Sequence, residues 1–291
     1  MILIYSCPAD ALDLELSIHI NDWLKSLGIA SKWLVSCEDL GQVYWFDEEI
    51  EVSVISGEEF EDYYNKLKPD MLIVDGLPFG SKGECINVIK QVPTLWFSRR
   101  LRWDSYLAYL DLKLVDIKLT TILLEPVSDS QQSFIQNGKF FELTFPILDA
   151  GQLPASNALD DDARHWLLLP SLDENQIAQQ GGYAMELIEK EQKIPHLLDV
   201  AEFDPFQLPL YHLVSKYQRV IGGCSYSAAC LALQWIGKDL KMGFRWVDQC
   251  DSWDDQTGRL SCIRKRKWIK KDRTLDWENW VKQWINSGGK L

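Results

Sequence analysis

Short apolar runs recur along the first half of the chain, and most are followed by a polar loop and then a helical pattern. The clearest runs are residues 2–5, 32–35, 71–74, 93–97 and 121–124. Consecutive apolar residues, without a polar residue at every second position, indicate strands that are covered on both faces. Strands that alternate with helices through short loops build a mostly parallel sheet flanked by helices. The pattern therefore predicts an α/β fold.

The segments between these runs carry helical spacing. In residues 11–27 the apolar side chains recur at intervals of three and four, which places them on one face of a helix. Gly28 follows as a stop signal, because glycine is common just beyond the last turn of a helix. Shorter helices are expected over residues 58–67, 84–90 and 105–114.

A change of composition near the middle of the chain indicates a domain boundary. Residues 145–162 contain two prolines, a glycine and three successive aspartates, and a second series of strands and helices follows them. The expected elements of this series are strands over 166–169 and 196–200, and helices over 183–191 and 275–285. We expect two domains, residues 1–147 and residues 148–291, with the last helix in the second.

The net charge of the chain limits the kinds of molecule that it is expected to bind. A formal net charge of -13 argues against a general nucleic-acid binder, which usually presents a basic face. Residues 263–271 are locally basic, and we interpret them as a solvated surface, with contact to a lipid or a nucleic acid as the alternative. Trp277, Trp280 and Trp284 fit a helix that packs onto the protein, because an aromatic stripe at helical spacing is usually core.

Cysteines and histidines show no pattern of a metal site. The seven cysteines form no close pair, so we expect free, mostly buried thiols in a reducing compartment. The four histidines lack metal-ligand spacing, and no metal ion is expected. The first apolar run is too short for a signal peptide, and no stretch is long enough for a transmembrane segment. A cytoplasmic location is therefore expected.

One local motif has the composition of an anion site. A short strand at residues 220–221 is followed by a glycine turn, by hydroxyl-bearing residues and by a helical run over 228–233. The turn and the start of the helix comprise Gly222, Gly223, Ser225, Tyr226 and Ser227. Free amide groups and the positive end of the helix dipole attract phosphate groups at such a place. We predict a phosphate-binding corner, and the alternative is a turn whose glycines only permit close packing.

Four segments of the chain resemble the GT-B glycosyltransferases, in the branch related to the peptidoglycan N-acetylglucosaminyltransferase. The segments are VIGGCSYSAACLAL and FRWVDQ in the second half, and PDMLIVDGLPFG and VPTLWFSRRLR in the first. The resemblance in layout extends over most of the chain. It implies two Rossmann-like domains that face each other over a cleft, and an enzyme that moves a sugar from a nucleotide-sugar donor to an acceptor.

The resemblance also implies roles for residues of the second domain. The glycine turn and Ser225, Tyr226 and Ser227 would surround the diphosphate of the donor, and Arg245 would neutralise its charge. Asp248 and Gln249 would bind the hydroxyl groups of the sugar. A helix N-terminus and an arginine can together stabilise the leaving diphosphate, so neither a metal ion nor a cofactor is expected beside the nucleotide-sugar co-substrate.

Catalytic and acceptor residues are expected at strand ends of the first domain. Sugar transfer needs a base for the acceptor proton, and Asp10 and Asp13 follow the first strand, although both could simply begin the helix. Acceptor contacts are predicted for four residues, each of which could instead be a turn residue or an ion-pair partner: Asp75, Arg99, Arg100 and Arg102.

Two departures from the resemblance favour an alternative without catalysis. The glutamate that the family usually places in the helix after the glycine turn is replaced here by Leu231. Residues 6–10 stand where the family has a loop rich in glycine with a histidine. A GT-B-like binding module or a subunit of a protein partner would show the same fold. A third interpretation is another two-domain α/β enzyme, such as a sugar-nucleotide epimerase.

Overall fold

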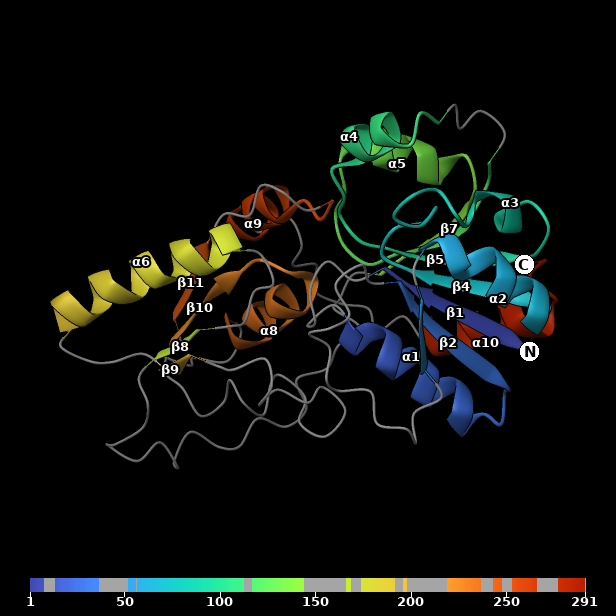
Figure 1. Ribbon diagram of the computed structural model, residues 1–291, viewed down its shortest axis with the longest axis horizontal. Coiled ribbons are helices and arrows are strands. Elements are labelled where there is room, and N and C mark those ends of the chain that lie inside the picture. The colour runs from blue at the N-terminus through green and yellow to red at the C-terminus, as the bar shows by residue number, and fades with distance from the viewer. Residues whose placement is uncertain are drawn as a thin grey trace.

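The computed structural model describes residues 1–7, 14–36, 52–55, 57–112, 117–143, 166–168, 174–191, 196–197, 219–236, 243–247, 253–265 and 277–290. These residues form two parallel sheets with helices around them (Figure 1). Among the described helices, none combines the length and the apolar character that crossing a bilayer requires.

The first sheet contains seven parallel strands in the order β3-β2-β1-β4-β5-β6-β7. The strands are β1 (Ile2–Ser6), β2 (Ser31–Ser36), β3 (Val52–Ile55), β4 (Met71–Asp75), β5 (Thr94–Ser98), β6 (Thr120–Leu123) and β7 (Lys139–Glu142). The order reverses between β1 and β4, which pair with each other in register. Open α/β sheets place their binding sites outside the carboxyl ends of the strands at such a reversal.

Helices connect these strands, and most lie where the sequence predicts them. They are α1 (Leu14–Ser26), α2 (Phe60–Leu67) after a single 3-10 turn at Gly57–Glu59, α3 (Ile86–Ile89), α4 (Trp103–Tyr109) and α5 (Asp129–Gln136). Helix α5 and strand β7 were not predicted. The five strands expected from apolar runs are confirmed, with bounds that differ by a residue or two at the ends.

The second sheet has four parallel strands in the order β11-β10-β8-β9. They are β8 (Trp166–Leu168), β9 (His196–Leu197), β10 (Arg219–Gly223) and β11 (Gly243–Val247), with α6 (Glu174–Glu191) and α8 (Tyr226–Ile236) beside them. Helix α9 (Gln256–Arg264) follows, and helix α10 (Trp277–Asn286) ends the series. The strands predicted from residue 166 onward are confirmed over their described residues, whereas β11 and α9 were not predicted.

The last helix packs on the first sheet, although it follows the second sheet in the chain. Val281 and Trp284 of α10 are fully buried. The ring of Trp280 stacks on Phe141 of β7, with ring centroids 5.3 Å apart, and Trp277 meets Phe97 of β5 edge-on. The predicted packing role of these tryptophans is confirmed. Both ends of the chain lie near this side of the first sheet (Figure 1).

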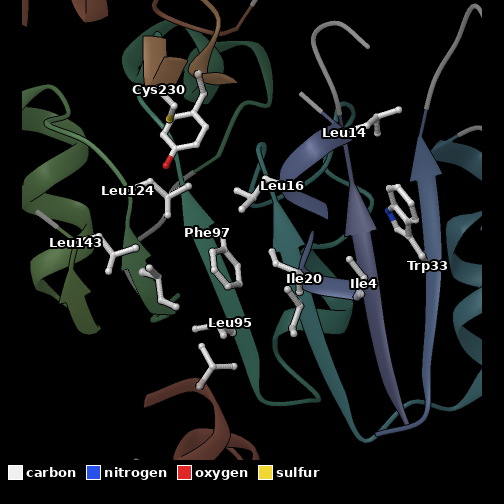
Figure 2. Close-up of a cluster of buried hydrophobic side chains, with 14 of the residues drawn as sticks. Ile4, Leu14, Leu16, Ile20, Trp33, Leu95, Phe97, Leu124, Leu143 and Cys230 are labelled. Carbon is white, nitrogen blue, oxygen red and sulfur yellow. The ribbon is translucent and has the colours of Figure 1, made fainter. Parts of the chain in front are cut away.

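Two hydrophobic clusters cover the two faces of the first sheet. Alternate residues of a strand enter different clusters, as with Leu3 and Ile4 of β1. The cluster that contains Ile4 also takes in Cys230 of α8, so both halves of the chain contribute to one continuous core (Figure 2). The described cysteines are free, and all but Cys262 are buried, which agrees with the prediction of unpaired thiols.

Candidate functional site

The strand, glycine turn and helix predicted as an anion site are all present. Strand β10 ends at Gly223, and α8 begins at Tyr226 with Ser225 before it. The hydroxyl oxygen of Ser225 accepts a hydrogen bond from the amide of Ala228, and its carbonyl oxygen accepts one from Ala229. Ser225 therefore caps the helix, and its side chain satisfies one of the amides that the first turn leaves without a backbone partner.

This turn faces the first half of the protein. The side chains of Ser225, Tyr226 and Ser227 are at most 1% exposed. Gly222 is buried as well, whereas Gly223 is half-buried. Five residues were predicted to contact the diphosphate, and Gly223 is the one of them that is exposed to solvent in part.

Strand β11 brings a further predicted donor residue beside the turn. Arg245 is the central residue of β11, and it pairs with Ile221 of β10, one position before Gly222. Leu231, which stands in place of the expected glutamate, lies in α8. Asp248 and Gln249 lie outside the described residues, as do Asp10 and Asp13 between β1 and α1.

Two of the predicted acceptor residues bind each other. Asp75 ends β4, and Arg99 follows β5, the neighbouring strand. The Nη2 group of Arg99 donates to both carboxylate oxygens of Asp75 at 2.7 Å, and both side chains are buried. Burial raises the pKa of Asp75, while the charge of Arg99 and the hydroxyl of Ser17 act in the opposite direction. The pair therefore joins the carboxyl ends of β4 and β5.

A series of hydrogen bonds from α1, β1 and β2 also reaches Asp75. The hydroxyl of Ser17 donates to Asp75 at 2.6 Å, so Ser17 must accept in its 2.6 Å contact with Ser6. The hydroxyl of Ser6 in turn accepts from Nε1 of Trp33 at 2.8 Å. The donors of Trp33, Ser6 and Ser17 thus follow one another toward the carboxylate of Asp75.

The remaining predicted acceptor residues, Arg100 and Arg102, lie at a junction between distant parts of the chain. The Nε group of Arg100 donates to Asp255 at 2.6 Å. The amide of Arg102 donates to the carbonyl oxygen of Trp253 at 2.9 Å. The alternative prediction, that an arginine of this cluster forms an ion pair, is confirmed for Arg99 and Arg100.

Sequence reasoning missed a buried charge cluster beside these arginines. Arg259 of α9 is fully buried between the carboxylates of Glu125 and Asp254. Its Nη1 group also donates to the carbonyl oxygen of Cys224, the residue between the glycine turn and the cap of α8. Glu125 follows a predicted strand, and a charged residue at a strand end is a signal that the sequence offers. Its partner Arg259 lies 134 positions away, so the sequence does not show that the two bind each other.

A second polar cluster, which is partly buried, joins β1 to the loop after β4. The hydroxyl of Tyr5 donates to Glu84, whose carboxylate also accepts the amides of Ser81 and Lys82. Burial raises the pKa of Tyr5, so this hydroxyl stays protonated. Over the described ranges, no three histidine, cysteine or acidic side chains gather in a way that could hold a metal ion.

Comparison with known proteins shows similarity in structure alone. No protein-family model matches the sequence, and no curated protein matches it. Among solved structures, MurG from Acinetobacter baumannii aligns with a TM-score of 0.50 and 11% identity, over 91% of this chain and 83% of MurG. The spinosyn rhamnosyltransferase SpnG, complexed with thymidine diphosphate, gives 0.52 and 12%, over 91% and 85%. The glycosyltransferase VinC, complexed with dTDP, gives 0.52 and 9%, over 93% and 92%.

The chain has the GT-B fold. This confirms the predicted class of two Rossmann-like domains and the likeness to MurG in architecture. Because the identities are only 9–12%, the comparisons show the fold and assign no role to individual residues. In this GT-B chain, the β10–α8 turn and the carboxyl edge of the first sheet meet at Tyr226, whose ring lies 5.5 Å from the Arg99 guanidinium.

Proposed function

We propose that this GT-B chain transfers a sugar from a nucleotide-sugar donor to an acceptor, without a metal ion. The observation that carries the proposal is the β10–Gly222–Gly223–α8 corner in the second sheet of a GT-B fold. Its helix dipole favours a negative charge at the turn. SpnG and VinC, which share the fold, are described with thymidine diphosphate bound, and this supports a nucleotide as the donor group.

In the proposed reaction, the second domain holds the donor. The backbone of Gly222 and Gly223 and the first turn of α8, at Ser225, Tyr226 and Ser227, lie against the diphosphate. Arg245 opposes the charge that develops on the leaving diphosphate, a role in which arginine forms paired hydrogen bonds. The sugar hydroxyls are bound by Asp248 and Gln249, which follow β11 in the chain.

The first domain supplies the base and the acceptor contacts. Asp10 or Asp13 removes the acceptor proton as the new bond forms, because both follow β1 at the strand-order reversal. Asp75 and Arg99 satisfy each other, so we assign them to holding the acceptor-side loops in place. Arg100 and Arg102 stay in the proposal as acceptor contacts at the rim of the same edge.

Nucleotide binding tests this proposal most directly. The purified chain is titrated with uridine, guanosine and thymidine diphosphates while its thermal unfolding is followed. A ligand that binds the native state raises the melting temperature, by an amount that grows with its concentration over the dissociation constant. We expect one of the three to do so, and R245A to lose the shift while melting as before. No shift with any of them contradicts the proposal.

The buried state of the turn favours a second candidate, a GT-B-like binding subunit without catalysis. Ser225, Tyr226 and Ser227 are enclosed, and the ribose contact expected in α8 is Leu231. A transferase consumes donor when its acceptor is present and hydrolyses it slowly when it is not. A binding subunit leaves the donor intact at high protein concentration and copurifies with a partner chain, so product analysis by mass spectrometry separates the two.

A further inference from the structure

A fully buried arginine joins three separate segments of the protein. Arg259 donates through Nε and Nη2 to the two oxygens of Glu125, both at 2.7 Å. Its Nη1 and Nη2 groups donate to the carboxylate of Asp254, and Nη1 also donates to the carbonyl oxygen of Cys224 at 2.7 Å. A guanidinium has five N–H donors, so every donor of Arg259 is used.

The partners of Arg259 come from both sheets. Glu125 lies just beyond the end of β6 in the first sheet, and one of its oxygens also accepts the amide of Arg100 at 2.8 Å. Cys224 lies between the end of β10 and the cap of α8 in the second. Arg259 therefore connects the carboxyl edge of the first sheet to the turn that begins α8.

The position of Arg259 is itself fixed by the first half. The residues just before α9 are bound to the loop after β5: Leu101 forms an isolated antiparallel bridge with Asp254, and the amide of Asp255 donates to Arg100 at 3.1 Å. Asp255 also caps α9 by accepting the amide of Gly258 at 2.9 Å. Helix α9 is thus attached to the first sheet through both backbone and side chains.

The hydrogen bond from Arg259 to the carbonyl oxygen of Cys224 orients the peptide group between Cys224 and Ser225. The peptide bond is planar and trans, so its C=O and N–H groups point in opposite directions. Because the carbonyl of Cys224 is directed at Arg259, the amide of Ser225 is directed away from it. We propose that Arg259 is a positioning residue, which orients the Cys224–Ser225 peptide for donor binding; this rests on the proposed function.

Lysine cannot replace Arg259 in this role. An ammonium group has three donors and no planar fork, so it cannot bind two carboxylates and a carbonyl in this arrangement. In E125Q the arginine keeps its bonds to Asp254 and Cys224, so a smaller effect is expected than in R259K. The matched control is R264K, which makes the same change at an exposed arginine in the last turn of α9.

Hydrogen exchange and nucleotide binding together test the proposal on the full chain. The probe amides are those of Ala228 and Ala229, which bond to Ser225, and the reference is the amide of Leu72, which bonds to Pro93 in the first sheet. In R259K we expect exchange at the probes to rise about tenfold relative to the reference, the scale of losing hydrogen bonds to charged groups. Affinity for the diphosphate that binds the wild type best falls by a similar factor, and R264K changes neither.

Each result bears on a different part of the proposal. If R259K accelerates probe and reference amides equally, or binds the nucleotide as well as R264K does, the positioning role is overturned. If R259K does not fold, E125Q replaces it, and exchange at the probes equal to that of R264K has the same consequence. If the wild type binds none of the uridine, guanosine and thymidine diphosphates, the proposed function fails, while the exchange data still decide whether Arg259 orients the turn.

Discussion

The guanidinium of Arg99 lies over the ring of Tyr226, with 5.5 Å between the guanidinium carbon and the ring centroid. Arg99 follows β5 of the first sheet and Tyr226 begins α8 of the second, so the contact spans the two halves. A cation over an aromatic face is attracted by the ring, more strongly where water is excluded. Asp75 binds the same guanidinium. Arg99 therefore contacts both the end of β4, beside the strand-order reversal of the first sheet, and the first residue of α8.

Replacing Asp75 by asparagine should destabilise the protein by about 3–5 kcal/mol, the usual range when one partner of a buried ion pair is removed. Asparagine has a similar shape but leaves the buried charge of Arg99 without a counter-charge. Urea denaturation followed by tryptophan fluorescence measures the change in the free energy of unfolding.

An exposed pair provides the control for that experiment. Asp70 binds the amino group of Met1, and its side chain is 79% exposed. Solvent screens such a pair, so D70N should leave the urea midpoint unchanged. If D75N and D70N unfold at the same midpoint, the pair between Asp75 and Arg99 does not stabilise the fold as argued.

Removing the hydroxyl of Ser17 should cost about 1–3 kcal/mol, because buried hydrogen bonds to a charged group are worth more than neutral ones. In S17A the carboxylate of Asp75 loses one donor, and the hydroxyl of Ser6 loses its acceptor. S17T is the matched variant, since threonine keeps the hydroxyl and adds a methyl group. A loss that is equal in S17A and S17T points to packing rather than to the hydrogen-bonded chain.

The central strands could be predicted because burial on both faces leaves a direct mark in the sequence. Residues 71–74 and 95–97 are continuous apolar runs, and they lie in β4 and β5. Strand β7 lacks that mark because it lies at the edge of the sheet, with charged residues at both ends and mostly exposed side chains. Helix α9 was missed since Gly258 and its polar neighbours give no amphipathic pattern.

The partners of the site residues could not be predicted in the same way. Asp75 and Arg99 each lie at a strand end, as expected, but only the neighbouring positions of β4 and β5 bring them together. Arg259 and Glu125 are far apart in the chain, and their bond depends on how α9 returns to the first sheet. A sequence shows which side chains carry charge, whereas the folded topology decides whether they bind each other or a ligand.

Helix α10 should contribute strongly to the stability of the first sheet. Trp284 is fully buried there, and truncating a buried aromatic residue costs about 3–5 kcal/mol, so W284A should show a loss in that range by urea denaturation. The indole nitrogen of Trp284 has no hydrogen-bond partner within the described structure, so W284F should lose less. Equal losses in the two variants would contradict the assignment of the effect to packing.

Thiol reactivity provides a test of the turn itself. Burial raises the pKa values of Cys7, Cys85, Cys224 and Cys230. A raised pKa leaves less thiolate at a given pH, and only the thiolate reacts, so at pH 8 these residues should stay unlabelled in the native protein. Cys262 is half-buried and should react with iodoacetamide at least about tenfold faster.

Peptide mass spectrometry after timed alkylation gives the rate for each cysteine, and unfolding in urea should equalise the rates. Cys224 is the informative residue, because it sits between Gly223 and the cap of α8 and its carbonyl is bound by Arg259. If Cys224 reacts as fast as Cys262 while Cys7 stays protected, the turn opens without unfolding of the first sheet. That result would contradict a turn fixed by Arg259, since a fixed turn exposes its thiol only when the whole protein unfolds.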